Sequence, residues 1–314
     1  MFKSINTSIK MLNILPEIDD IIYFRKAGKT KSNNNKYNKI RENVIYNIFN
    51  IDDDYFNDVT YGEEWKIFYD KLTKTIKNLC DVPFSSISIK HMGGMKYNYD
   101  FLISFMDENK NIIKNVKTEF KHNNSTTSQL PQFLEIYDKD CKNVYELCSV
   151  MSYGEFYYDN FLDSYLSVDN ELNAVQKPNK EDYLKNVYDI KYKHEFFSLL
   201  YNNKKNKIKE KRQVANNSTK SYLKMYLQTF NFDKINEKIK ESQMNKMFLL
   251  WDCNNFYIEE LNMKELKIKG IKKINNLYFD ISTENFKYDI RVRINWGNNN
   301  GLANPRWKFI FINK

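Results

Sequence analysis

The fold is decided by residues 97–121, which read YNYDFLISFMDENKNIIKNVKTEFK. Its middle, 106–111, is dense in Asp, Asn and Glu, which tolerate turn conformations. The flanks are rich in aromatic and β-branched residues, which favour strands. We therefore predict an antiparallel hairpin that turns at 106–111. Cross-strand partners lie about equidistant from the turn, so Asp100 comes roughly level with residues 117–121.

The second strand of this hairpin ends in Glu119, Phe120 and Lys121. Side chains alternate faces along a strand, so Glu119 and Lys121 share one face and Phe120 points into whatever packs behind. Two carboxylates, from Asp100 and Glu119, then converge with an ammonium group. Such oxygen ligands suit Mg²⁺ or Mn²⁺, and the lysine could orient or deprotonate a metal-bound water.

The spacing of these residues, with 18 positions between Asp100 and Glu119, resembles the motif of the PD-(D/E)xK nuclease superfamily. The resemblance implies a restriction-endonuclease-like fold and catalysis by Asp100, Glu119 and Lys121. It also implies that the two acids bind the metal, that Phe120 offers its backbone carbonyl, and that Lys121 serves the attacking water.

Two further positions bear on the resemblance. Tyr99 stands where the motif has proline, a position that the family allows to vary. Some members add a glutamate from the helix before the hairpin, which would correspond here to Glu63 or Glu64. The residue pattern alone also fits a surface strand whose Glu and Lys side chains are solvated.

Helical and strand patterns surround the hairpin. Residues 36–50 and 62–80 repeat apolar residues at helical spacing, and the second stripe is among the clearest in the chain. A short strand is predicted through Ile87 and Ile89. After the hairpin we predict a helix from about Leu130, with Ser128 as its N-cap. The basic residues 24–39 are predicted to form a loop, either a phosphate-gripping arm or a solvated linker.

The second half of the chain is predicted to change from helices to strands. Residues 141–201 read as mostly helical, a positive run covers 204–224, and alternating strand patterns begin at Met247. Alternation places two arginines of one strand on the same face, where they could meet phosphate. The positive run is either a backbone-binding stripe or a solvated helix face. The predicted nucleic-acid-binding residues are Lys205, Lys207, Lys211, Arg212, Lys220, Arg291 and Arg293.

Composition limits the kind of protein. The 314 residues are 42% hydrophobic and 16% aromatic, which is more than a disordered tail carries. A formal net charge of +9 favours an anionic partner, and nucleic acid fits best, with DNA favoured over RNA. The four Cys show no CxxC spacing, which argues against a zinc site.

The compartment is predicted from what the sequence lacks. No window is apolar enough to span a bilayer, and the N-terminus has no apolar signal region. We expect a soluble intracellular protein of the cytoplasm or nucleus, with no membrane partner. Abundant Asn, Lys, Ile, Tyr and Phe indicate an AT-rich genome, for example a viral one.

These observations combine into one hypothesis. We predict an α/β protein whose restriction-endonuclease-like core is a mixed β-sheet flanked by helices, with a helical linker and a β-rich C-terminal region. The expected divisions are a basic arm at 1–45, the core at 46–175, a helical basic region at 176–246 and strands at 247–314. The predicted function is that of a Mg²⁺- or Mn²⁺-dependent nuclease that hydrolyses phosphodiester bonds, specifically a DNA endonuclease. The alternatives are a non-catalytic nucleic-acid-binding protein and a structural protein whose charge serves solubility.

Overall fold

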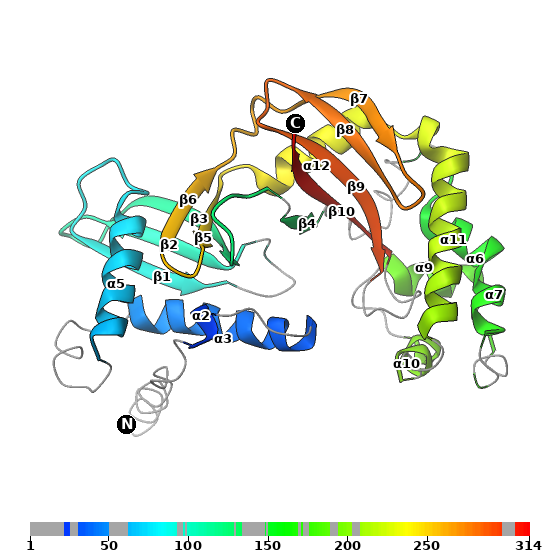
Figure 1. The fold of residues 1–314 in the computed structure, drawn as a ribbon, viewed down its shortest axis with the longest axis horizontal. Helices are drawn as coiled ribbons and strands as arrows, with labels where there is room; N and C mark the ends of the chain where they lie inside the picture. Colours follow the sequence, from blue (N-terminus) through cyan, green and yellow to red (C-terminus); the bar gives the residue numbers. More distant parts are fainter. Residues whose placement is uncertain are drawn as a thin grey trace. The chain divides into compact units, whose positions relative to one another are not determined.

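The chain forms two compact units, one of residues 1–127 with 245–261 and one of 128–244 with 262–314 (Figure 1). The structure is a computed structural model. It describes residues 22–25, 31–49, 62–92, 97, 99–128, 130–133, 148, 150–168, 171, 176–188, 194–202, 208–296 and 305–314.

The first unit is built on a five-stranded mixed sheet. Its strands run in the order β1-β2-β3-β5-β6, and β3 and β5 are parallel while the other neighbours are antiparallel. The bounds are β1 Ser86–His91, β2 Phe101–Met106, β3 Ile112–His122, β5 Lys246–Trp251 and β6 Phe256–Glu260.

The predicted hairpin is confirmed as β2 and β3. Phe101 lies opposite Thr118, and the two strands meet at a turn in which Asp107 Oδ1 accepts a hydrogen bond from the backbone N–H of Asn111 at 2.8 Å. Lys110 has a φ of 63°, the left-handed conformation that tight turns often require. The polar turn residues therefore set the register that brings Asp100 level with the end of β3.

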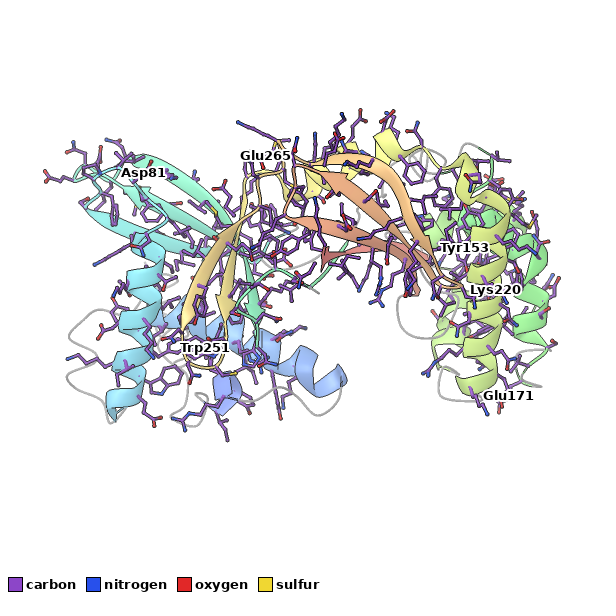
Figure 2. All side chains as sticks on the ribbon, turned by 45° about the horizontal axis from the view of Figure 1, so that its top comes forward. Asp81, Tyr153, Glu171, Lys220, Trp251 and Glu265 are labelled. Atoms are coloured by element: carbon purple, nitrogen blue, oxygen red, sulfur yellow. The ribbon has the colours of Figure 1, made fainter. Side chains whose placement is uncertain are left out.

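Among the described residues of this unit, the helices are α2 Ile22–Arg25, α3 Lys31–Phe49 and α5 Gly62–Lys77. The apolar stripes predicted for α3 and α5 are confirmed, and their members are buried in one core together with Phe120. Trp251, at the end of β5, packs against Phe68 of α5 with ring centroids 5.4 Å apart (Figure 2). The loop predicted at 24–39 is wrong, because Phe24 and Arg25 belong to α2 and α3 begins at Lys31, while residues 26–30 lie outside the described residues.

The connection between β3 and β5 contains most of the second unit. Parallel neighbours cannot be joined by a tight turn and need a long crossover. Here the chain leaves the first unit at 127 and returns at 245, so the crossover includes residues 128–244 of the second unit. β5 and β6 therefore belong to the first unit's sheet, although the sequence assigned residues from 247 onward to one C-terminal region.

The second unit contains an antiparallel sheet and a set of helices. Its strands run in the order β4-β10-β9-β8-β7. Their bounds are β4 Pro131–Phe133, β7 Lys267–Ile274, β8 Tyr278–Glu284, β9 Tyr288–Trp296 and β10 Pro305–Asn313. The helices are α6 Tyr153–Asn160, α7 Leu162–Leu166, α9 Lys180–Tyr188, α10 Glu195–Asn202, α11 Ile208–Tyr226 and α12 Phe232–Gln243, with a 3₁₀ turn at Leu227–Thr229.

The helix predicted from about Leu130 is wrong, since 131–133 form β4 and pair with β10. Pro131 has no N–H to donate, and an edge strand tolerates that loss. The expected division at 46–175, 176–246 and 247–314 also differs from the two observed units. Its boundaries followed changes in composition, whereas the units are defined by strand pairing. No helix in the described ranges has the length and apolar content that crossing a membrane requires.

Candidate functional site

Asp100 lies beside the end of β3, as predicted. It directly precedes β2, and its backbone N–H donates to the Thr118 carbonyl at 3.0 Å. Its Oδ2 accepts a hydrogen bond from the backbone N–H of Phe120 at 2.8 Å. The carboxylate is therefore fixed against the Glu119–Lys121 segment by both main-chain and side-chain bonds.

The backbone of Phe120 faces Asp100 as well. Within a strand, the N–H and C=O of one residue point toward the same neighbouring strand. Because the Phe120 N–H points to Asp100, its carbonyl oxygen lies on that side too. The Phe120 ring is 5% exposed and packs in the core. The Phe120 side chain therefore anchors this segment in the core, as strand alternation predicted.

Glu119 is the centre of a buried ion-pair cluster. Its side chain pairs through Oε1 with Lys121 and through Oε2 with Lys246, the first residue of β5. Lys246 is 3% exposed. Burial acts to raise the pKa of Glu119, but the two ammonium groups outweigh it and hold the pKa below its ordinary value. Glu119 is therefore ionised at neutral pH.

The pKa values of the two lysines of this cluster shift in opposite directions. Burial acts to lower the pKa of each. For Lys121 the carboxylates of Glu119 and Asp100 outweigh burial, and the pKa rises. For Lys246 burial prevails over the attraction of Glu119, and the pKa falls. Lys121 is the more firmly charged of the two.

Asp100 has a raised pKa, chiefly because it is buried and then because Glu119 repels its negative charge. A cation held between the two carboxylates would relieve both effects. The donor set of two carboxylates and one carbonyl is of the type that Mg²⁺ and Mn²⁺ prefer. These residues therefore fit a divalent metal ion in their chemistry.

A third carboxylate near the site comes from α3. Burial, and then repulsion by Asp100, raises the pKa of Glu42 to about 7. One of its oxygens lies 3.3 Å from Nε2 of His91. The sequence contains only an indirect signal for Glu42, namely its place beside the buried stripe of α3, the helix that includes Val44 and Ile48.

The glutamate expected from the preceding helix does not lie with this group. Glu64 of α5 is 58% exposed and pairs with Arg25 at 2.6 Å, and the side chain of Glu63 lies outside the described residues. Glu42 of α3, and not Glu64, is close enough to Asp100 for the two charges to repel each other. Within the part of the chain that the structure describes, no group of three or more His, Cys, Asp or Glu side chains is arranged to hold a metal.

His122 follows the catalytic candidates but has a structural contact. Its Nε2 lies 3.0 Å from the Phe24 carbonyl, to which Trp251 Nε1 also donates at 2.8 Å. Burial lowers the pKa of His122 to about 4, so the ring is neutral at physiological pH. The contact ties α2 to the edge of the site.

The predicted nucleic-acid-binding lysines of α11 do not form one exposed stripe. Lys211 is 3% exposed, and its ammonium group lies 5.8 Å from the ring centroid of Tyr165. It faces the helical core, because it falls on the buried side of α11. Arg212 is exposed. Lys220 is exposed as well (Figure 2). Lys205 and Lys207 lie outside the described residues.

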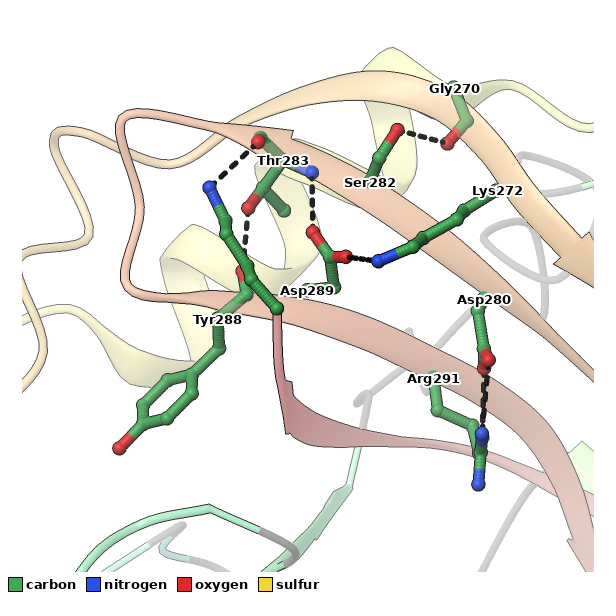
Figure 3. A network of polar contacts seen from close by, with 9 residues as sticks. Gly270, Lys272, Asp280, Ser282, Thr283, Tyr288, Asp289 and Arg291 are labelled. Carbon is green, nitrogen blue, oxygen red and sulfur yellow. Dashed lines mark hydrogen bonds and ion pairs between the residues drawn. The ribbon is translucent and has the colours of Figure 1, made fainter.

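The two arginines of β9 share one face, as predicted, but among the described residues only Arg293 has no acidic partner. Arg291 pairs with Asp280 through Nε at 2.8 Å and Nη2 at 3.0 Å (Figure 3). Its guanidinium group also stacks over the Tyr278 ring. The hypothesis that both arginines are available to phosphate is therefore wrong for Arg291 in this structure.

The chain was compared with protein-family models, curated proteins and solved structures. The chain matches no family model, no curated protein and no solved structure.

Proposed function

We propose that the protein is a metal-dependent nuclease that hydrolyses phosphodiester bonds in nucleic acid, with DNA as the favoured substrate. One observation carries the proposal: Asp100 is hydrogen-bonded to the backbone of the Glu119–Lys121 segment, so two carboxylates, a carbonyl and an ammonium group meet at one hairpin end. The mixed sheet that contains this hairpin, with α3 and α5 before it, supports a restriction-endonuclease-like core.

Some of these residues would hold a metal ion, and the two lysines would balance charge and orient the other groups. Asp100, Glu119 and the Phe120 carbonyl would hold Mg²⁺ or Mn²⁺. When bound, such an ion polarises the phosphodiester and lowers the pKa of a coordinated water. Lys121, with its raised pKa, orients the attacking water and offsets the negative charge that develops on the phosphate. Lys246 fixes the orientation of the Glu119 carboxylate.

A second candidate is a non-catalytic nucleic-acid-binding protein with the same core. The observation that favours it is the state of Glu119, whose two oxygens are each engaged by a lysine. An acid neutralised in this way can serve as a structural ion pair. The net charge of +9 suits either candidate, because both bind a polyanion.

Cleavage assays separate the two candidates. Supercoiled DNA, linear DNA and RNA are incubated with Mg²⁺ or Mn²⁺ and with the wild type, Asp100→Ala or Lys121→Ala. Glu108→Ala is the matched control, because Glu108 is an exposed acid in the turn of the same hairpin. We expect cleavage by the wild type and the control, and a loss of about 10²-fold or more in the two site variants. Equal products from all four proteins would exclude catalysis at this site.

A further inference from the structure

The sheet of the second unit has one apolar face and one polar face. Strand alternation places Phe279, Ile281 and Val292 on the buried face, where each is fully enclosed. The opposite face carries the residues between them on β8 and β9. Cross-strand pairs on that face join Tyr278 to Arg293 and Asp280 to Arg291.

Each acid described on this polar face of β8 and β9 already has a cationic partner. Asp280 binds Arg291, as stated above. Asp289 pairs with Lys272 at 2.6 Å and also accepts a hydrogen bond from the Thr283 backbone N–H at 3.1 Å (Figure 3). Glu284, at the far end of β8, pairs with Lys267 at 3.0 Å. The acids of the face are therefore neutralised.

Arg293 takes no part in these ion pairs. Among the described residues it forms no ion pair, and its Nε is buried with no hydrogen-bond partner. A buried donor without an acceptor costs free energy, more so when it carries charge. The segment 297–304, which joins β9 to β10, reads GNNNGLAN and contains no acid.

The neighbours of Arg293 across the ladder are an aromatic residue and a lysine. Across the ladder on one side lies Tyr278, and on the other side lies Lys308 of β10. Arg291, two residues away, keeps Tyr278 in place by stacking at 4.0 Å from its ring centroid. An anion that approached Arg293 would thus meet a second cation nearby and a fixed aromatic edge.

We propose that Arg293, with Lys308 beside it, binds a backbone phosphate of nucleic acid on this sheet face. A guanidinium group offers a planar fork of donors that matches two phosphate oxygens, and it stays charged at all physiological pH values. The Arg293 side chain is partly exposed, so the solvent-facing part of its guanidinium group is what a phosphate would contact. The choice of nucleic acid as the source of phosphate rests on the proposed function, whereas the anion site rests on Arg293 itself.

Binding of a fluorescein-labelled DNA duplex, measured by fluorescence anisotropy in EDTA over a series of salt concentrations, tests this site. EDTA removes the divalent ions on which cleavage would depend, so the outcome is independent of the proposed activity. The variants are Arg293→Gln and the matched control Arg291→Gln. Both remove one arginine from the same face of β9 and change the net charge equally. Thermal unfolding checks that each variant is folded.

We expect Arg293→Gln to weaken binding about tenfold at low salt and to reduce the slope of log K against log salt by about one. Arg291→Gln should change the slope less, because Asp280 already neutralises that arginine. Equal losses in the two variants would mean that only overall charge matters, and unchanged binding by Arg293→Gln would mean that no phosphate binds there; either result overturns the proposal. If Arg293→Gln weakens binding but no protein cleaves DNA, the site stands and the nuclease assignment fails.

Discussion

The Asp100 carboxylate accepts a hydrogen bond from the Phe120 backbone N–H at 2.8 Å. The regular pairing of β2 with β3 ends at Phe101 and Thr118, so this bond continues the hairpin one step farther by means of a side chain. The same carboxylate has a raised pKa because it is buried beside Glu119. Asp100 therefore has a structural role and a proposed catalytic role that substitutions can separate.

Asp100→Asn should preserve the fold and abolish cleavage. The amide oxygen of Asn can still accept from the Phe120 N–H, so the free energy of unfolding should stay within about 1 kcal/mol of the wild type. Asp100→Ala leaves that N–H without an acceptor and should cost about 1–3 kcal/mol. Urea unfolding and plasmid cleavage measure the two effects. Cleavage by Asp100→Asn at the wild-type rate would remove Asp100 from the proposed mechanism.

Lys246→Met should destabilise the first unit more than Lys121→Met does. Both lysines pair with Glu119, but the Lys246 side chain is 3% exposed and the Lys121 side chain is 26% exposed. Removing one partner of a buried ion pair leaves an unpaired charge away from water, which lowers the free energy of unfolding by about 3 kcal/mol. Solvent screens the Lys121–Glu119 pair more, so Lys121→Met should lower the free energy of unfolding less than Lys246→Met does.

A double variant tests whether this cost comes from the unpaired carboxylate. Glu119→Gln combined with Lys246→Met should be more stable than the sum of the single changes predicts, by about 1–3 kcal/mol. Urea unfolding of the four proteins completes the cycle. Additive effects would show that Lys246 stabilises the sheet by packing alone, without holding Glu119.

Mn²⁺ should raise the melting temperature of the wild type and leave the melting temperature of Asp100→Asn almost unchanged. An ion that binds only the folded state stabilises it, by about 2.7 kcal/mol when its concentration is one hundred times the dissociation constant. Asp81→Asn is the matched control, since Asp81 is 85% exposed and pairs with Lys114. Differential scanning calorimetry at constant ionic strength measures the shifts. Equal shifts in all three proteins would place the metal elsewhere.

The hairpin was predictable because its signals are local. A polar turn between two apolar strands fixes which residues lie opposite, and so the approach of Asp100 to the end of β3 followed from counting along the chain. The apolar stripe of α5 is local in the same way. Each of these features depends on residues close together in the sequence, and the structure confirms them.

Lys246 and β4 could not be predicted because distant pairing decides them. Lys246 reaches Glu119 only because β5 lies parallel to β3, and the connection between these strands runs through the second unit. Ser128 and Pro131 are typical of a helix start, yet pairing with β10 makes 131–133 a strand. Local preference is worth a few tenths of a kcal/mol to about 1 kcal/mol per residue, and ladder formation overrides it.

Glu42 illustrates a choice that only packing makes. Both α3 and α5 precede the hairpin, and both carry glutamates next to a buried stripe. The sequence pattern favoured Glu64, but that side chain points to solvent and pairs with Arg25. Which helix presents its acid to Asp100 depends on how each helix is rotated against the sheet, and one stripe of apolar residues does not fix that rotation closely enough.

Glu42→Gln should stabilise the protein above neutral pH and have little effect near pH 4.5. Burial raises the pKa of Glu42 from 4.5 to about 7 in the folded protein. Between these values the folded state keeps a proton that the unfolded state has lost, so the wild type loses stability as pH rises through this range. Above pH 7 the ionised Glu42 lowers the free energy of unfolding by on the order of 3 kcal/mol, at about 1.4 kcal/mol per pKa unit. Gln carries no charge and avoids this loss.

Urea unfolding of the wild type and Glu42→Gln at several pH values from 4 to 8 measures this difference. Comparing the two proteins at each pH cancels the opposing contribution of His122, whose lowered pKa makes stability fall as pH drops from 6.5 toward about 4. Glu64→Gln is the matched control, and its exposed side chain should leave the curve parallel to the wild type. If Glu42→Gln also runs parallel to the wild type, Glu42 is not held in the buried, negatively charged surroundings that place it beside Asp100.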